Sequence, residues 1–264
     1  MGILNVTSDS FYDGGRCGDV GTAIVHGRRL GDEGADLIDV GGESSRPGAA
    51  PITAMEELAR VVPVVAALRR TCDVAISIDT TKAEVAEAAL AAGAEVVNDV
   101  SAGRFDARML PLVAAHAATI VLVHMQGTPA TMQQAPHYDD VLSEVEAFLV
   151  ERVSAAVAAG IDRSRIWIDP GIGFGKRREH NFTLLAHLAR LRRLGLPVVI
   201  GVSRKRFLAM SGDGGPDDRL AASLAAAALA AAAGAAVVRV HDVAATRRAI
   251  AVADEWRRAA ERSG

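Results

Sequence analysis

The sequence predicts a single α/β domain that spans residues 1–264 and folds as a (β/α)8 barrel, the TIM-barrel architecture. Short, almost wholly apolar runs alternate with segments of helical spacing eight times along the chain, which favours a closed parallel sheet. A length of 264 residues with 50% hydrophobic content fits one barrel of about 250 residues. The apolar runs also tend to end in polar residues, as strands do where they carry an active site.

The first half of the chain contains five of these strands, each an apolar or alternating run. They are expected at Gly2 to Val6, Ala35 to Val40, Val74 to Ile78, Glu95 to Val97 and Thr119 to Val123. Helical spacing of apolar residues predicts helices at Ala23 to Gly34, Ala54 to Arg70, Lys82 to Ala92 and Arg104 to Ala115. Polar, glycine-containing loops follow the first two strands.

The second half continues the same alternation. A long helix from Val141 to Ala159 is closed by Gly160, and the remaining strands are expected at Ile166 to Asp169, Pro197 to Val202 and Ala236 to Val240. Helices are expected at Thr183 to Leu194, Asp217 to Ala233 and Val243 to Arg262. The stretch from Leu220 to Val238 is interpreted as a buried alanine-rich helix and a strand rather than a membrane span, because alanine is only weakly lipophilic.

Composition narrows the class of partner. A formal net charge of -3 and an isoelectric point near 6.2 give no field that would attract nucleic acid or an anionic membrane, so we expect a small-molecule partner. Cys17 and Cys72 lack metal-ligand spacing and suit two free thiols in a reducing compartment. No secretory signal precedes the first strand, so a cytoplasmic location is expected. The alanine-rich helix is a candidate subunit interface, and the expected assembly is a homodimer.

The stretch from Asp169 to Lys176 has the strongest signature of a binding site. A buried strand delivers Asp169 to a loop of alternating glycines, in which Phe174 offers a flat face and Lys176 a cation. A phosphate-binding Walker loop is excluded, because it would need glycine at Pro170 and a hydroxyl at Arg177. The alternative is a tight corner without a ligand.

Polar residues recur at the strand ends, and a barrel would gather them at one mouth. They are Asn5, Asp79, Asn98, His124, Asp169, Ser203 and His241. Each has a structural alternative, such as capping the next helix or forming a local hydrogen bond. Asp79, Asn98 and Asp169 would suit a flat heterocycle rich in N–H donors, whereas Asn5, Arg46, Arg239 and His241 could meet an anion. The alternative for Arg239 is an exposed ion pair with a carboxylate such as Asp242.

Seven motifs together carry a specific resemblance. They are Gly2-Ile3-Leu4-Asn5-Val6-Thr7, Asp39 to Gly48, Ser77-Ile78-Asp79-Thr80, Asn98-Asp99-Val100-Ser101, Asp169 to Lys176, Ser203-Arg204-Lys205 and Arg239-Val240-His241-Asp242. From the first strand to the last helix, the chain closely resembles the dihydropteroate synthase family. That family is a (β/α)8 barrel that makes 7,8-dihydropteroate and pyrophosphate from 6-hydroxymethyl-7,8-dihydropterin diphosphate and p-aminobenzoate, using Mg2+.

The resemblance implies roles for the matching residues. Pterin recognition falls on Asp79, Asn98, Asp169 and Lys205, and pyrophosphate recognition falls on Asn5, Arg46, Arg239 and His241, with Asn5 near the metal. Ser45, Pro47, Phe174, Ser203 and Arg204 would surround p-aminobenzoate. The groups expected to take part directly in catalysis are Asn5, Lys205, Arg239 and His241. The implied mechanism is dissociative, with departure of pyrophosphate before attack by the arylamine.

Departures from the family pattern do not remove a charged ligand. Ser8, Tyr12, Ala102 and Val123 stand where proline, serine, glycine and methionine are usual. Two other functions remain open: a pterin-binding methyltransferase domain that serves a corrinoid, and a pterin-binding relative without turnover. The pyrophosphate residues argue against the first, and the intact motifs argue against the second.

Overall fold

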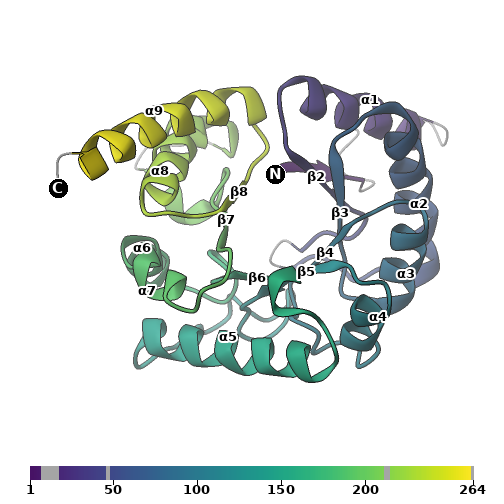
Figure 1. Cartoon of the computed structure of the whole chain (residues 1–264), viewed down its shortest axis with the longest axis horizontal. Helices are drawn as coiled ribbons and strands as arrows, with labels where there is room; N and C mark the ends of the chain where they lie inside the picture. The colour runs from purple at the N-terminus through teal and green to yellow at the C-terminus, as the bar shows by residue number, and fades with distance from the viewer. Residues whose placement is uncertain (7–17, 46–47, 211–214, 263–264) are drawn as a thin grey trace.

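The computed structural model describes residues 1–6, 18–45, 48–210 and 215–262, and it confirms the barrel. Over these residues, eight strands form a central parallel sheet with the helices on its outside (Figure 1). The strands are β1 Gly2–Asn5, β2 Leu37–Gly41, β3 Ala75–Asp79, β4 Val96–Asp99, β5 Thr119–Val123, β6 Ile166–Asp169, β7 Val199–Gly201 and β8 Val237–Arg239.

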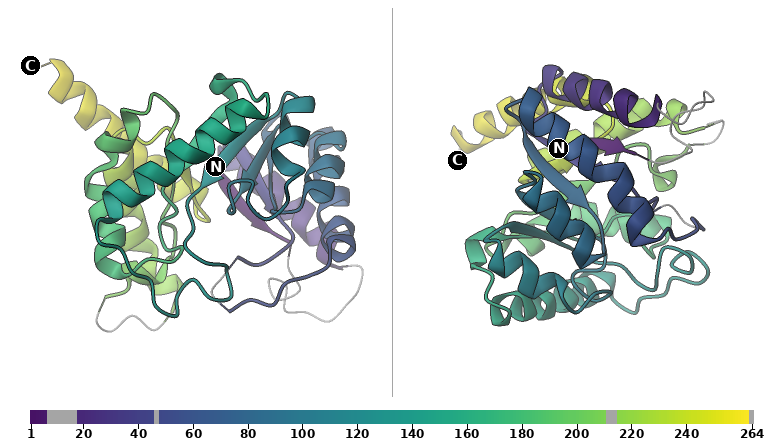
Figure 2. Two further views of the ribbon diagram at one scale, coloured as in Figure 1. Left: turned by 90° about the horizontal axis from the view of Figure 1, so that it is seen from below. Right: turned by 90° about the vertical axis from the view of Figure 1, so that its right-hand side faces the viewer.

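The helices follow the strands in the expected order. They are α1 Gly18–Asp32, α2 Ala54–Thr71, α3 Ala83–Ala91, α4 Met109–Ala115, α5 Val141–Ala158, α6 Arg178–Ala186, α7 Leu188–Arg192, α8 Leu220–Ala232 and α9 Val243–Arg262. Short 3-10 turns lie at η2 Arg163–Arg165, η3 Arg206–Leu208 and η4 Asp217–Arg219. The end of α9 extends beyond the body of the barrel toward the C-terminus (Figure 2).

Two backbone connections close the sheet into a barrel. Strands β1 to β6 pair in sequence order, and β7 pairs with β8. An isolated parallel bridge between Ile168 and Val198 joins β6 to the start of β7. A second bridge joins Gly2 to Val240, where the N–H of Ile3 donates to the Val240 carbonyl at 2.8 Å. The last strand therefore meets the first.

The strands bury both faces, which explains their nearly continuous apolar sequence. Ile38, Ile76 and Ile120 belong to the large core between the strands and the helices. Their strand neighbours Leu37 and Val121 belong to a separate apolar cluster in the barrel interior. This alternation follows from the two-residue period of a strand.

Three differences from the predicted helices stand out. Helix α1 begins at Gly18 rather than Ala23. Helix α4 begins at Met109 rather than Arg104, because the Asp99 carboxylate accepts hydrogen bonds from the N–H groups of Ser101 and Gly103, both at 2.7 Å, and holds a turn there.

The third difference is a break in the helix expected from Thr183 to Leu194. The structure divides this segment between α6 and α7 at His187, whose φ and ψ of -114° and 26° are not helical. The alanine-rich segment forms α8 and β8 as expected. Within the described residues, no helix is both long and apolar enough to cross a membrane. Cys72 is a free thiol, and Cys17 lies outside the described residues.

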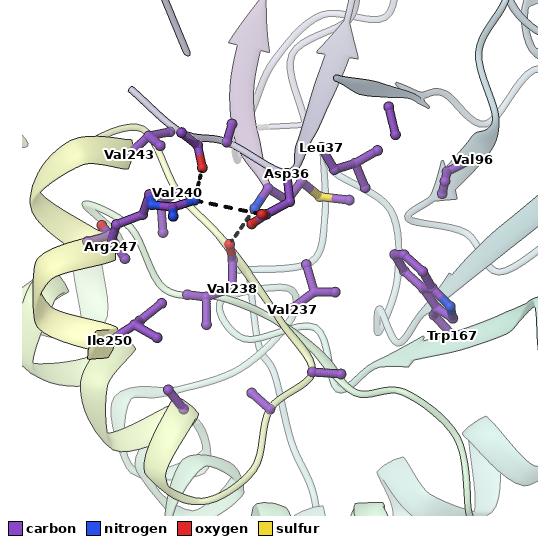
Figure 3. Close-up of a pocket in the computed structure, with 18 of the residues that line it drawn as sticks. Asp36, Leu37, Val96, Trp167, Val237, Val238, Val240, Val243, Arg247 and Ile250 are labelled. Carbon is purple, nitrogen blue, oxygen red and sulfur yellow. Dashed lines mark hydrogen bonds and ion pairs between the residues drawn. The ribbon is translucent and has the colours of Figure 1, made fainter. Parts of the chain in front are cut away.

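A cavity of about 830 Å³ lies at the amino ends of the strands. Leu37, Val96, Trp167 and Val237 line it, and Figure 3 shows Trp167 and Val96 across the cavity from Val237. At its rim, Arg247 donates to the Gly34 carbonyl and lies 3.7 Å from the Asp36 carboxylate. This cavity is at the opposite end of the barrel from the polar strand ends.

Candidate active site at the carboxyl ends of the strands

The sheet register brings the predicted polar residues to one mouth. Asn5 is paired with Gly41, Gly41 with Asp79, and Asp79 with Asn98, so these positions form one row across β1 to β4. Gly41 has no side chain and so leaves space beside Asp79. A Cβ added at Gly41 would lie 3.4 Å from the Asp79 Cβ and fill that space. At the same end, Asp169 is paired with Val123 and Arg239 with Gly201.

Arg239 is the centre of a largely buried polar cluster. Its Nε donates to Asp39 Oδ2 at 2.5 Å, and its Nη2 donates to Asp79 Oδ2 at 2.7 Å. The same Asp39 oxygen accepts from Asn98 Nδ2 at 3.1 Å. The expected alternative of an exposed pair between Arg239 and Asp242 is therefore wrong, since Arg239 spans β2 and β3 inside the barrel.

Two carboxylates, Asp39 and Asp79, share this one guanidinium, and the pKa values of Asp79 and Arg239 reflect the excess of negative charge. Burial raises the pKa of Asp79 to about 7, Arg239 opposes the rise, and the nearby Asp39 carboxylate adds to it. Burial acts to lower the pKa of Arg239, but Asp39 and Asp79 together raise it above its ordinary value. Arg239 is thus charged at any physiological pH, and Asp79 titrates near neutrality.

A second cluster combines Asp169, Lys205 and Phe174. Asp169 is buried, and its Oδ1 accepts a 2.6 Å hydrogen bond from the Gly171 N–H. Burial raises the pKa of Asp169, and Lys205 opposes that rise. Burial lowers the pKa of Lys205 to about 8, with Asp169 acting in the opposite direction. The Lys205 Nζ lies 4.7 Å from the centre of the Phe174 ring and donates to the Ile172 carbonyl.

The ends of β7 and β8 are joined by Ser203 and His241. The Ser203 Oγ accepts from the His241 N–H at 3.1 Å and lies 3.0 Å from His241 Nδ1. Arg204 instead forms a two-point ion pair with Asp242, at 2.9 and 2.7 Å, and also contacts Asp217. The resemblance placed Arg204 beside p-aminobenzoate, and this pairing was not expected from the sequence.

The loop after β2 is anchored at its base by a third cluster, of Lys82 with two glutamates. Lys82 Nζ lies 2.6 Å from Glu43 and 2.5 Å from the fully buried Glu57. Glu43 also accepts from the Ile52 N–H at 3.1 Å, and Arg60 donates to the Gly42 carbonyl at 3.0 Å. Ser45, which follows this base, is partly exposed; the predicted ligands Arg46 and Pro47 lie outside the described residues.

Sequence reasoning missed Asp39 as a member of the site. It is fully buried, and it orients both Arg239 and Asn98. A signal was available, because Asp39 is a carboxylate in the middle of the otherwise apolar strand β2. Asp39 is two positions from both Leu37 and Gly41 in the sequence, so all three share the face that lines the barrel. A charge on that face of a buried strand indicates a partner inside the barrel.

His124 was among the polar strand ends but has a different environment. It is buried, and its Nδ1 lies 2.8 Å from the buried Lys176 Nζ. Burial lowers the pKa of His124 to about 2, and the Lys176 cation adds to this effect. His124 is therefore neutral, and it belongs to the support of the glycine-rich loop.

Comparison with known proteins identifies a family. The pattern described as "Pterin binding enzyme" matches residues 1–241. The dihydropteroate synthase of Escherichia coli K12 is 44% identical over 254 residues, which cover 96% of this chain and 90% of that protein.

Two solved structures from Xanthomonas albilineans agree with the barrel over most of its length. Dihydropteroate synthase with 4-aminobenzoic acid has a TM-score of 0.90 and 52% identity, and the match covers 96% of this chain and 90% of that one. The complex with 7,8-dihydropteroate has a TM-score of 0.86 and 49% identity, with the same coverage.

Proposed function

The chain belongs to the pterin binding enzyme family and is a transferase of folate biosynthesis, and we propose that its own mouth residues carry out the condensation that gives 7,8-dihydropteroate. The substrates are 6-hydroxymethyl-7,8-dihydropterin diphosphate and p-aminobenzoate, and pyrophosphate leaves. The observation that supports this assignment best is the set of buried Asn98 and Asp169 and largely buried Asp79, beside Lys205, at one end of the barrel.

Pterin recognition rests on acceptors that face a ligand rich in N–H groups. A carboxylate can accept two parallel hydrogen bonds from an amino group and a ring N–H, and burial strengthens both. We assign this role to Asp169, whose charge is balanced by Lys205. Asn98 offers its amide oxygen, since its nitrogen is bonded to Asp39. Asp79 adds a carboxylate whose pKa near 7 permits either protonation state.

The diphosphate is assigned to Asn5, Arg46, Arg239 and His241. Arg239 uses Nε and Nη2 for Asp39 and Asp79, and Nη1 makes no hydrogen bond within the described residues. That nitrogen can meet a phosphate oxygen without breaking the buried cluster. His241 lies two residues past the end of β8, where it is partly exposed and its Nδ1 lies 3.0 Å from Ser203 Oγ. The two side chains would stabilise charge on the departing pyrophosphate.

Mg2+ fits this donor set. The described residues contain no group of three or more His, Cys, Asp or Glu that could hold a metal alone. Mg2+ commonly takes one or two protein oxygens together with substrate phosphates, so Asn5 with a diphosphate suffices. When bound, the ion would neutralise charge on the leaving group.

The reaction is dissociative in this proposal. The C–O bond to pyrophosphate breaks with its electron pair on the leaving oxygen, and a methylene cation conjugated to the pterin remains. The neutral nitrogen of p-aminobenzoate then attacks that carbon, and the acidic anilinium that forms releases its proton to solvent. Because the cation is strongly electrophilic, no strong general base is needed. Asp79 and Asp169 would stabilise the positive charge. Ser45, Pro47, Phe174, Ser203 and Arg204 are assigned to the p-aminobenzoate pocket.

The assembly and location are part of the proposal. Leu229 on α8 and Val252 and Trp256 on α9 are 71%, 71% and 64% exposed, and the two helices pack together. We assign this apolar face to a homodimer in the cytoplasm. Sedimentation should give a dimer, and Trp256→Glu should shift it toward monomer; a wild-type monomer at micromolar concentration would contradict the assembly.

The assay for the proposed function measures pyrophosphate release from the pterin diphosphate. Release should require both p-aminobenzoate and Mg2+, and EDTA should abolish it. By calorimetry, p-aminobenzoate should bind appreciably only when pyrophosphate and Mg2+ are present, because the loop that includes Arg46 contributes to both sites. Absence of 7,8-dihydropteroate with all three components present would reject the assignment.

A further inference from the structure

Lysine is rare in this chain, and its positions are informative. Of 29 basic residues, only Lys82, Lys176 and Lys205 are lysine, and the remainder are arginine. All three follow a strand at the carboxyl end of the barrel, after β3, β6 and β7. A chain that uses arginine almost everywhere else keeps the compact ammonium group at these positions. Lysine offers a point donor where the planar guanidinium does not fit.

Lys176 is buried and is not among the residues assigned to either substrate. Its Nζ lies 3.0 Å from the Gly171 carbonyl, 3.0 Å from the Phe174 carbonyl and 2.8 Å from His124 Nδ1. A lysine nitrogen can make three hydrogen bonds in addition to its bond to the side chain, and these three partners account for all of them. Burial lowers the pKa of Lys176, and the Asp169 charge acts against that change.

The two carbonyls are the ends of one tight turn. The Phe174 N–H donates to the Gly171 carbonyl at 3.0 Å, so Lys176 binds both ends of the turn that presents Phe174. His124 adds a link to the end of β5, where its N–H donates to the Asp169 carbonyl at 2.9 Å. Lys176 therefore ties the turn to the neighbouring strand end.

The whole loop is held by side-chain donors rather than by a sheet. Besides the two carbonyls that Lys176 binds, the Ile172 carbonyl accepts from Lys205, that of Gly173 from Gln133 at 2.7 Å, and that of Gly175 from Tyr138 at 2.8 Å. Left-handed glycines make these directions possible, with φ of 66° at Gly171 and 60° at Gly175. A Cβ at Gly171 would lie 1.8 Å from the His124 carbonyl oxygen.

We propose that Lys176, with His124, is a positioning residue that sets the Phe174 face of the p-aminobenzoate pocket and thereby controls affinity for the arylamine substrate. The inference rests on the proposed function, because it assumes that Phe174 contacts p-aminobenzoate. Lys176 itself is assigned to neither substrate. It holds the backbone so that the Phe174 ring lies 4.7 Å from Lys205 Nζ.

The test is Lys176→Met, which keeps the length of the side chain and removes its hydrogen bonds. KM for p-aminobenzoate should rise about tenfold or more, while pterin affinity by calorimetry changes less than about threefold, because small displacements of positioning groups have effects of this size. Lys176→Arg should not restore KM, since a guanidinium cannot present one nitrogen to all three partners.

A matched pair at His124 keeps the proposal testable if Lys176→Met does not fold. Asparagine and leucine have the same shape, but only His124→Asn keeps an acceptor near the position of Nδ1. His124→Asn should therefore have a p-aminobenzoate KM at least about threefold closer to wild type than His124→Leu.

Three results would overturn the proposal: an unchanged KM in Lys176→Met, equal loss of affinity for both substrates, or identical behaviour of the two His124 variants. Failure of the proposed function looks different, because the wild-type protein itself would then form no 7,8-dihydropteroate.

Discussion

The two ends of the barrel are built from the same strands but differ in chemistry. At the amino end, Leu37, Val96 and Trp167 line a cavity of about 830 Å³, with the exposed pair of Asp36 and Arg247 at its rim. At the carboxyl end, two to four residues further along the strands, the interior carries carboxylates and the Arg239 guanidinium. Charges buried without full compensation reduce stability, which the raised pKa of Asp79 reflects. Similar substitutions at the two ends of the barrel should therefore have different effects on activity and stability.

The largest contrast is expected for removal of arginine. Arg239→Ala should lower turnover about 10²-fold or more, because one preorganised group that stabilises the leaving charge is lost. It should also lower the free energy of unfolding by about 3 to 5 kcal/mol, since the buried Asp39 and the largely buried Asp79 lose their partner. Urea unfolding and steady-state kinetics, measured well below the melting temperature, give the two values.

Arg247→Ala is the control at the amino end. Arg247 and Asp36 form an exposed pair at 3.7 Å, so its loss should change stability by only about 0 to 1 kcal/mol and leave turnover intact. Near wild-type turnover in Arg239→Ala would end the assignment of Arg239 to pyrophosphate.

The next contrast concerns carboxylates. Asp169→Asn should weaken pterin binding by about 2 to 4 kcal/mol, because an amide places a donor against one of the pterin's N–H groups. The Gly171 N–H donates to Asp169 Oδ1 and can still donate to an asparagine oxygen, so the fold should persist. Calorimetry measures the affinity, and Asp36→Asn at the amino end serves as the control. Equal pterin affinity in wild type and Asp169→Asn would refute this role.

A pH dependence should arise only from the carboxyl end. The pKa of Lys205 is lowered to about 8 by burial, so the side chain carries its charge below that pH and loses it above. If the cation assists substrate binding, kcat/KM for the pterin diphosphate should fall up to about tenfold per pH unit above pH 8. Lys205→Arg keeps its charge and should remove this decline, even if the variant is slower. A decline that persists unchanged in Lys205→Arg would assign it to another group.

The smallest effect is expected from adding carbon at each end. Ala75 lines the amino-end cavity, and Ala75→Val should raise the free energy of unfolding by up to about 1 kcal/mol without altering either KM. Gly41→Ala adds a methyl group beside Asp79 at the other end and should raise the pterin KM with little change in stability. Urea midpoints and kinetics compare the pair, and a reversed pattern would contradict the division of roles.

Much of the site could be predicted because barrels impose a simple rule. Asp79, Asn98 and Asp169 end buried strands, and a closed parallel sheet must bring such ends together. The rule says nothing about which side chains pair with each other. Arg204 and Arg239 stand at similar places after β7 and in β8, yet Arg204 pairs with Asp242 on the rim and Arg239 with Asp39 inside the barrel. Sequence spacing could not separate these two outcomes.

The sequence by itself determined the alternation of strands and helices, because apolar periodicity is a local property of the chain. It also determined the glycine-rich turn after Asp169, since only glycine adopts left-handed conformations without strain. Only the tertiary structure decided that Asp39 holds Arg239, 200 positions away, and that Lys176 lies against His124, 52 positions away. These contacts depend on barrel closure and register, which act between segments that the chain separates widely. For the same reason, only the folded chain determines the pKa values of Asp79 and Lys205, because burial and neighbouring charges set them.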